Sequence, residues 1–278
     1  MDEFEKLILR FKDKEFLVIN ATGGNGDVLL LNGLIKKLKE FKIKFNVFSH
    51  NKHFKKYYKL FKKLGLKTKV LPLIFGKGKL EGDVVLIRGG GYFNDVWKDY
   101  YVLEDVLANF PDKPVILCPH TFYFKCTDFA KFFMNHKNFV YLFCREKTSF
   151  NIIHQVFSNY RNLLVNIFLS PDTAFYFSKE DFEFMNLGYT LNAFRNDVEA
   201  KVSSVDRSHD IVKIPYEVYV QKIINAGVVN TDRLHVAILG AITGKKTSLY
   251  ANSYHKNKSV YDYSLKKFDN VTFIDRIP

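Results

Sequence analysis

The sequence predicts an α/β protein built from two Rossmann-like domains that face each other across a cleft. Short apolar runs alternate with helical periodicity along the 278 residues, and strands that alternate with helices form parallel sheets. The same alternation resumes after a polar break at residues 135–138. We therefore expect domains at residues 1–137 and 138–278. Two such halves would bring the loops that follow their strands into a shared cleft, where ligands of open α/β sheets bind.

In the first half, short apolar runs predict buried strands, and apolar positions repeated at a helical spacing predict the helices between them. The predicted strands are Phe16–Asn20, Phe45–Phe48, Val84–Ile87 and Val115–Cys118. The predicted helices are a segment with Leu30, Leu31, Leu34, Ile35 and Leu38 on one face, then Phe54–Leu64 and Trp97–Asn109.

The second half predicts the same kinds of element by the same criteria. Strands or extended segments are expected at Phe139–Cys144, Leu163–Leu169, Ala174–Phe177, Leu187–Phe194, Val228–Val229 and Thr247–Tyr250. Helices are expected at Glu146–Phe157, at Tyr216–Ala226 and from Arg233 onward.

Composition limits the classes of protein to consider. The chain is 47% hydrophobic, but no apolar run approaches the roughly 18 to 20 residues that span a bilayer. The first five residues are acidic and lack the order of a signal peptide. The three cysteines have no C-x-x-C spacing, so we expect small buried thiols in a reducing cytoplasm rather than disulfides or zinc. No clustered His, Cys and carboxylate spacing indicates another metal.

The formal net charge of +13 is unevenly distributed. Between Lys36 and Lys79 the only carboxylate is Glu40, while lysines recur throughout residues 52–59. Such a surface attracts nucleic acid, acidic lipid head groups or a phosphorylated substrate. The alternative is a compositional bias, with the lysines on solvated helix faces. Because nucleic-acid binders more often interleave arginines with exposed aromatics, we expect no nucleic-acid partner.

Residues 230–235 are the most informative stretch of the chain. A short strand stops at a polar tetrad and a helix then begins, which places Arg233 and His235 at a helix N-terminus. Unpaired N–H groups and the helix dipole favour an anion there. A guanidinium binds phosphate or carboxylate in a fork, and an imidazole can transfer a proton near neutral pH. The alternative is that Asp232 caps the helix and Arg233 is an ordinary arginine.

Two glycine-rich loops also follow predicted strands. The first includes Gly24, Asn25 and Asp27, and it either brings backbone N–H groups to a ligand or forms a plain tight turn. The second contains three consecutive glycines, Gly90 and Gly91 among them. Because such a run costs backbone entropy, we interpret it as a site of close approach by a ligand.

Arginines follow three of the predicted strands. Arg145 could reach into the cleft or pair with Glu146, and Arg195 again ends a strand. Asp172 follows another extended run, where it is either functional or a turn former. Together Arg145, Arg195 and Arg233 could converge on one polyanionic ligand.

At this point the motifs match a known family. Their order is Gly-Gly-Asn-Gly-Asp, Gly-Gly-Gly-Tyr-Phe-Asn-Asp, Arg-Glu-Lys-Thr-Ser, Pro-Asp-Thr-Ala-Phe, Arg-Asn-Asp, Thr-Asp-Arg-Leu-His and Asn-Ser-Tyr-His-Lys-Asn. This order resembles the polysaccharide pyruvyltransferase family from about Asn20 to Leu265. The resemblance implies a two-domain GT-B-like fold. It also implies transfer of pyruvate from phosphoenolpyruvate to sugar hydroxyls as a ketal, with no further cofactor.

The resemblance suggests roles for the residues named above. Phosphoenolpyruvate is close to trianionic, so several fixed cations are needed; the candidates are Arg233, Arg195, Arg145 and Lys256, with Asn252 from the same motif as Lys256. His235 would protonate the enol methylene. Positive neighbours disfavour a protonated imidazole, so this role requires a carboxylate nearby, either Asp232 or Asp172.

The remaining expectations concern the acceptor. Asp27 or Asp95 would take the proton of the attacking hydroxyl, and His120 either contacts the acceptor sugar or merely ends its strand. The N-terminal domain would hold the acceptor and the C-terminal domain the donor. The motif around Asn252 resembles the branch found with bacterial exopolysaccharide and capsule clusters. The acceptor would then be such a glycan, a cell-surface glycan or a lipid-linked precursor, with peripheral association at an anionic membrane surface.

Two other functions fit parts of the pattern. A GT-B glycosyltransferase would use arginines and glycine loops to bind the diphosphate of a nucleotide sugar, and fold alone does not fix the reaction. A basic nucleic-acid-binding module would explain the lysines. It would leave the arginines at the strand ends and His235 without a role.

Overall fold

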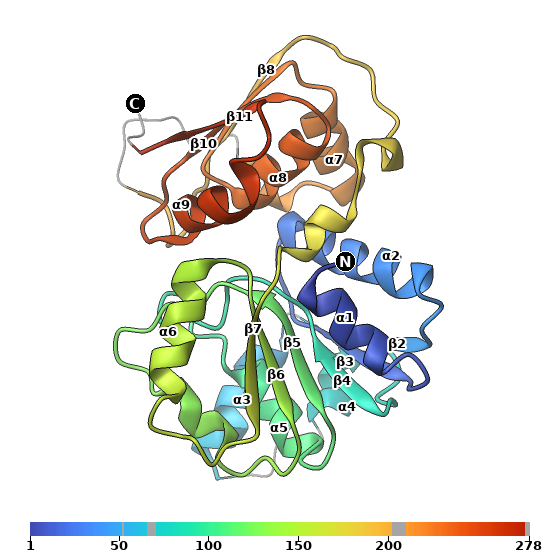
Figure 1. The fold of residues 1–278 in the computed structure, drawn as a ribbon, viewed down its shortest axis with the longest axis vertical. Helices are drawn as coiled ribbons and strands as arrows, with labels where there is room; N and C mark the ends of the chain where they lie inside the picture. The colour runs from blue at the N-terminus through green and yellow to red at the C-terminus, as the bar shows by residue number, and fades with distance from the viewer. Residues whose placement is uncertain (52, 66–70, 202–209, 276–278) are drawn as a thin grey trace. The chain divides into compact units, whose positions relative to one another are not determined.

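The computed structural model describes residues 1–51, 53–65, 71–201 and 210–275; Lys52, part of the lysine-rich stretch, lies outside them. The chain divides into two compact units (Figure 1). Unit 1 comprises Met1–Thr22, Ile35–Arg145 and Ser149–Ser170, and unit 2 comprises Gly23–Leu34, Glu146–Thr148 and Pro171–Pro278.

Unit 1 contains a seven-stranded sheet, counted over the described residues, in the order β3-β2-β1-β4-β5-β6-β7. Neighbouring strands run parallel except β3, which pairs antiparallel with β2. The strands are β1 Phe16–Asn20, β2 Phe45–His50, β3 Gly76–Lys77, β4 Val84–Ile87, β5 Val115–His120, β6 Val140–Cys144 and β7 Val165–Leu169. The order reverses between β1 and β4, so the loops after these two strands flank the switch point of the sheet.

The helices of unit 1 include those that the periodicity of the sequence predicts. They are α1 Glu3–Arg10, α2 Asn25–Glu40, α3 Phe54–Lys63, α4 Leu71–Phe75, α5 Tyr101–Asn109, the 3₁₀ helix η1 Phe129–Phe133 and α6 Lys147–Phe157. Residues 25–34 of α2 cluster with unit 2 and its last turns with unit 1. The core is rich in aromatic residues; Phe129, for example, lies 4.9 Å from Phe124 and 5.3 Å from Phe133 between ring centroids.

Unit 2 contains a parallel sheet of four strands in the order β11-β10-β9-β8, again counted over the described residues. Its strands are β8 Thr190–Ala193, β9 Val228–Thr231, β10 Lys246–Tyr250 and β11 Val271–Ile274. Its helical segments are α7 Tyr216–Ile224, α8 Leu234–Ile242, α9 Lys256–Val260, the π-helical turn η5 Tyr261–Leu265 and the 3₁₀ turns η2 Thr173–Tyr176, η3 Lys179–Asp181 and η4 Ile211–Lys213.

The small-residue run that follows His235 forms the central helix of unit 2. Most of α8 is buried, which fits a helix that is apolar on all sides. A Cβ atom added at Gly240 would lie 2.6 Å from the Oγ1 atom of Thr247, so this glycine lets α8 pack closely against β10. That packing fixes where α8 begins, and with it the position of the residues at its N-terminus.

The structure corrects several expectations. Of the predicted extended run Ala174–Phe177, residues 174–176 belong instead to η2, because the side chain of Asp172 accepts a hydrogen bond from the N–H of Ala174 at 2.9 Å and starts a helical turn. Phe177 is extended as predicted. The helix α1 was not predicted, although Asp2 and Glu5 form the reciprocal capping box that starts it. The strand β11 was also missed.

The expected boundary after residue 137 falls just before β6, a strand of the unit 1 sheet. Both β6 and β7 continue that sheet, and unit 1 extends to Ser170 apart from the short stretch Glu146–Thr148. The polar residues 135–138 therefore belong to a loop between strands of one sheet. No helix within the described residues is both long and apolar enough to cross a membrane.

Candidate active site

The end of β9 and the start of α8 hold the polar tetrad in a fixed conformation. The hydroxyl of Thr231 donates to the carbonyl of Ala193 at 2.6 Å and accepts from the N–H of Arg233 at 2.9 Å. Arg233 is the N-cap residue of α8, with an extended backbone. Asp232 does not cap the helix; its Oδ1 atom accepts from the N–H of Arg195 at 2.7 Å and ties the end of β9 to the end of β8.

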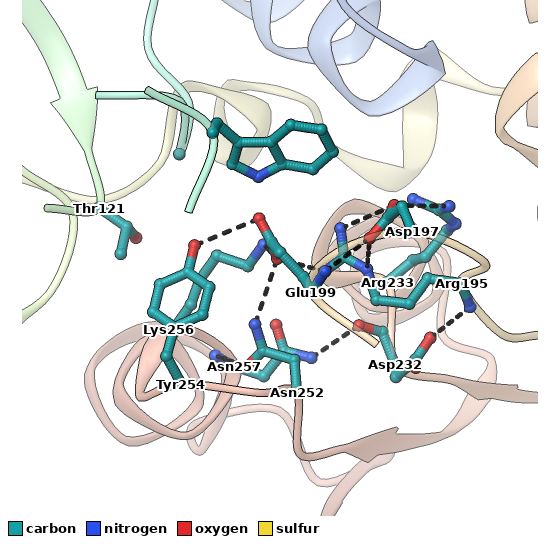
Figure 2. A network of polar contacts seen from close by, with 12 residues as sticks. Thr121, Arg195, Asp197, Glu199, Asp232, Arg233, Asn252, Tyr254, Lys256 and Asn257 are labelled. Carbon is teal, nitrogen blue, oxygen red and sulfur yellow. Dashed lines mark hydrogen bonds and ion pairs between the residues drawn. The ribbon is translucent and has the colours of Figure 1, made fainter. Parts of the chain in front are cut away.

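The two strand-end arginines of unit 2 lie together (Figure 2). Both contact Asp197: the Nε atom of Arg195 lies 2.8 Å from Oδ1, and the Nη2 atom of Arg233 lies 3.1 Å from Oδ2. The Nε atom of Arg233 also donates to Oδ1 of Asp210 at 2.6 Å, and its Nη2 atom contacts Oδ2. Asp210 is itself anchored by the N–H groups of Asn196 and Val212. The fork of Arg233 is therefore oriented by two carboxylates.

Glu199 organises the other side of the same cluster (Figure 2). This residue is 2% exposed. Its carboxylate contacts Nη1 of Arg195 and Nζ of Lys256, and it also accepts from Asn252 at 3.2 Å and from the hydroxyl of Tyr254 at 3.3 Å. It thereby joins the segment after β8 to the segment before α9. Sequence analysis missed Glu199, Asp197 and Asp210 as site residues.

Asn257 holds the α9 segment in place. Its side-chain amide donates to the carbonyls of Asp232 and Tyr250, at 2.7 and 2.8 Å. Its backbone N–H donates to Oδ1 of Asn252 at 3.2 Å. Asn252 and Lys256 are consequently positioned against the same loop that carries Arg233.

Cations and carboxylates contact one another in this cluster. The cations are Arg195, Arg233 and Lys256, and the carboxylates in contact with them are Asp197, Glu199 and Asp210. Burial alone would lower the pKa of Arg195, but Glu199 and Asp197 raise the pKa above its ordinary value. Burial would likewise raise the pKa of Asp197 and Asp210, yet the neighbouring guanidinium groups lower both. Arg195, Asp197 and Asp210 therefore stay ionised at neutral pH.

A small pocket opens between these cations and two helix N-termini, entirely within unit 2. Its volume is about 60 Å³, room for about two water molecules or an anionic group of similar size. The lining residues are Gly26, Arg195, Val212, Tyr219, Arg233, Leu234, His235 and Lys256. The N-terminal turns of α2 and α8 contribute positive dipole ends. The pocket therefore suits an anion.

His235 lies at this pocket in the first turn of α8. Its Nε2 atom is 3.4 Å from Oδ2 of Asp172, which is completely buried. Two carboxylates, Asp172 and Asp232, were predicted as neighbours of the imidazole. The carboxylate of Asp172 lies beside the ring, whereas the Oδ1 atom of Asp232 accepts a hydrogen bond from the N–H of Arg195. Gly26 packs against the other side of the ring: an added Cβ atom would lie 2.3 Å from Nδ1 of His235.

If His235 transfers the proton, as the resemblance implies, Gly26→Ala should displace its imidazole and lower turnover by about 10²-fold, a loss that a misplacement of about 1 Å can cause. Helix stability should not fall on conformational grounds, since alanine is the better helix former. The measurement is kcat and KM for wild type and variant. In a His235→Ala background the same substitution should have no further effect; an equal additional loss there would contradict the assignment.

The first glycine loop forms the capped start of α2. The carboxylate of Asp27 accepts from the N–H of Gly24 at 2.9 Å. The side-chain amide of Asn25 donates to the carbonyls of Ile214 and Ile211, at 2.8 and 3.3 Å. Asn25 thus ties α2 to the segment that carries Val212 of the pocket. Of this loop, Gly26 lines the pocket.

The other predicted residues belong to unit 1. Arg145 is 1% exposed, and its Nε atom donates to the hydroxyl of Thr121 at 2.8 Å. His120 is buried, with Nδ1 2.6 Å from the carbonyl of Cys118 and the ring stacked on Phe93. Arg145 is not among the lining residues of the unit 2 pocket. Two of the three strand-end arginines, Arg195 and Arg233, therefore meet there.

Asp95 and the second glycine loop have structural explanations. The carboxylate of Asp95 accepts from the N–H groups of Lys125 and Cys126, at 2.6 and 2.9 Å, and from Thr127 and Tyr100. Although burial raises it, the pKa of Asp95 is well below its ordinary value because of these hydrogen bonds. A carboxylate of low pKa is a weak base.

The close approach predicted for the triple glycine is made by another strand. A Cβ atom at Gly89 would lie 2.6 Å from the carbonyl oxygen of Pro119 in β5. Gly90 has φ of 154°, which favours glycine, and its carbonyl accepts from the N–H of Thr121 at 2.9 Å. Packing against β5 accounts for both residues.

Arg88, which sequence analysis did not select, crosses the switch point of the unit 1 sheet. It is fully buried, and its guanidinium donates to the side chain of Asn20 at 2.9 Å and to the carbonyls of Gly89 and Ala21 at 3.0 and 3.2 Å. The side chain therefore connects the loops after β1 and β4. The sequence feature that could have identified Arg88 is its position directly before the three consecutive glycines.

Comparison with known proteins supplies the family. A family model described as polysaccharide pyruvyl transferase matches residues 26–254. The match includes the pocket residues except Lys256. No functionally curated protein matches the chain. A crystal structure of a functionally uncharacterised protein from Klebsiella pneumoniae is similar in fold, with a TM-score of 0.68 and 23% identity, covering 99% of this chain and 98% of that one.

Proposed function

The chain belongs to the polysaccharide pyruvyl transferase family, and from this premise we propose that it transfers pyruvate from phosphoenolpyruvate to two hydroxyl groups of a sugar, forming a cyclic ketal. One observation carries the proposal: Arg195, Arg233, Lys256 and His235 line one pocket at the N-terminus of α8. A donor with a phosphate and a carboxylate needs several fixed cations with a proton-transfer group beside them.

The donor binds by competing for cations that are already oriented. Asp197 and Asp210 hold the fork of Arg233, and Glu199 holds Lys256 and Arg195. A bound phosphate replaces some of these contacts with its own oxygens and gains the dipoles of the two helix N-termini. Because these cations already contact carboxylates, we expect a low affinity for small univalent anions. The affinity rises for a donor that carries more charge.

The reaction conserves atoms and charge. A proton is added to the methylene of phosphoenolpyruvate, which becomes the methyl group, and the adjacent carbon becomes oxocarbenium-like. A sugar hydroxyl forms a C–O bond to that carbon and loses its proton to a base. The C–O bond to phosphate then breaks, and a second hydroxyl closes the ring and releases its proton. The products are the sugar ketal and hydrogen phosphate.

His235 is the proton donor in this proposal, and Asp172 is the positioning residue. The contact at Nε2 orients the imidazole, as a carboxylate does for a catalytic histidine in other enzymes. Asp27, which belongs to unit 2 with the pocket, is the preferred hydroxyl base. Asp95 is a weaker candidate because of its lowered pKa.

For the acceptor we propose an exopolysaccharide, capsule or cell-surface glycan of bacterial type, or its lipid-linked precursor, modified in the cytoplasm. Unit 1 would bind the acceptor and unit 2 the donor. The two units would then correspond to the two domains of a GT-B-like enzyme.

A donor screen tests the proposal. We expect phosphate release from phosphoenolpyruvate in the presence of a suitable glycan, and a pyruvate ketal on that glycan by mass spectrometry. Release of free nucleotide from a nucleotide sugar, with no phosphate from phosphoenolpyruvate, would identify a glycosyltransferase instead and overturn the proposal.

A further inference from the structure

The helix α3 presents a strip of lysines and leucines to solvent. Its inner face buries Phe54 and Tyr58. The outer face carries a strip defined by Lys56, Lys59, Leu60, Lys63 and Leu64. These residues are spaced by three or four positions, so they share one face of the helix and of the turn that ends it. We refer to this set as the α3 strip.

The lysines of the α3 strip face away from the acidic residues packed beside the helix. The ion pairs of α3 lie on its flank, where Lys55 contacts Asp99 and Lys62 contacts Glu104. Residues 41–79 contain twelve lysines and no aspartate, glutamate or arginine. The nearest preceding carboxylate, Glu40, contacts Lys36 and Lys37. The strip therefore carries a positive charge that its own segment does not balance.

Apolar side chains extend the strip along one edge. Leu60 and Leu64 are 46% and 60% exposed, and Ile74 on α4 is also 60% exposed. Tyr57, three residues before Leu60 on the same helix, stacks on Phe75 of α4 with ring centroids 4.3 Å apart. Solvated lysine faces do not require three exposed branched aliphatic residues at their edge. The combination is typical of helices that lie in a membrane interface.

We propose that the α3 strip and Ile74 bind the surface of an anionic bilayer, with the lysines at the head groups and the aliphatic side chains in the boundary region. Juxtamembrane basic residues each contribute a modest attraction to anionic lipid, and apolar side chains add to it. Nucleic acid fits less well, because the segment has no arginine and its exposed apolar residues are aliphatic. This inference does not depend on the reaction catalysed by unit 2.

The test is co-sedimentation of the full chain with vesicles of phosphatidylcholine alone and with added phosphatidylglycerol. Binding should require the anionic lipid and should weaken as salt is raised. In the double variant Lys56→Glu/Lys63→Glu, each substitution should lower vesicle binding by about fivefold or more. The Leu60→Ser/Leu64→Ser variant should also lower it. Thermal melting checks that each variant is folded.

Matched controls lie elsewhere on unit 1. Lys12→Glu/Lys14→Glu makes the same change of charge, and Met134→Ser/Leu164→Ser the same kind of apolar change, all at exposed positions. These controls should bind like wild type. No binding of wild type at low salt, or equal losses in the controls, would overturn the proposal. So would tight binding of a short RNA that Leu60→Ser/Leu64→Ser leaves unchanged. Turnover with a water-soluble acceptor should be unaffected by the strip variants, which separates this test from that of the reaction.

Discussion

Replacement of His235 by alanine should leave unit 2 folded and lower the rate of ketal formation by about 10²- to 10⁴-fold, the usual contribution of a proton-transfer group. The imidazole lines the pocket beside Arg233 and Lys256. Its removal deletes the proposed proton donor and leaves the cations in place. We therefore expect the loss in kcat, with a smaller change in the KM for phosphoenolpyruvate, measured by phosphate release.

Asp172→Asn is the companion variant. It keeps the shape of the side chain but removes the charge that faces Nε2 of His235. Because Asp172 is a positioning residue, Asp172→Asn should change kcat more than the KM for the donor. The reduction in kcat should be smaller than that caused by His235→Ala. Normal turnover by folded His235→Ala protein would remove His235 from the mechanism.

Arg233→Ala should lower kcat/KM for the donor by about 10- to 200-fold, the range for losing a hydrogen bond to a charged group. It should also destabilise unit 2, because Asp210 and Asp197 lose the guanidinium that they contact. Breaking a buried pair by removing one partner costs about 3 to 5 kcal/mol, and this pair should cost less because it is partly exposed. Activity assays and chemical denaturation measure the two effects.

The double variant Arg233→Ala/Asp210→Asn is the matched control. It restores the charge balance, so stability should recover while donor binding should not. The stability effect also has a defined pH dependence. Because Arg233 lowers the pKa of Asp210, the contribution is fully present above the unfolded aspartate value of about 3.9. It is lost as the pH falls through the lower folded value. An equally large stability difference in strong acid would argue against this pair.

Buried strands and amphipathic helices were predictable because each leaves a local pattern. Phe16–Asn20 and Val84–Ile87 are strands at the predicted residues, and Phe54 begins α3 as expected. The 3₁₀ turn η2 was not predicted, because its cause is one side-chain hydrogen bond from Asp172 rather than a periodic pattern. The domain boundary was placed at a polar loop, since local polarity does not reveal that the next strand joins the same sheet.

The sequence predicted the cationic residues of the candidate site but not its carboxylates. Arg195 and Arg233 follow strands, a position that sequence reveals, and each belongs to a recognisable motif. Glu199 is separated by 57 residues from Lys256, and Asp210 by 23 from Arg233. Such pairs depend on the tertiary arrangement of the segment after β8. The free-energy cost of burying an unpaired charge explains why these ion pairs exist. It does not allow the partner residue to be predicted from the sequence.

The contacts between these cations and carboxylates also constrain how this enzyme can diverge. A change at Arg195, Arg233 or Lys256 leaves one or two carboxylates with fewer cationic contacts, and a change at Asp197, Glu199 or Asp210 leaves a cation with fewer contacts. We therefore expect homologues that lack one of these charged residues also to have a substitution at the residue that it contacts. A laboratory selection for new donors would progress through paired codon changes at these positions more readily than through single ones.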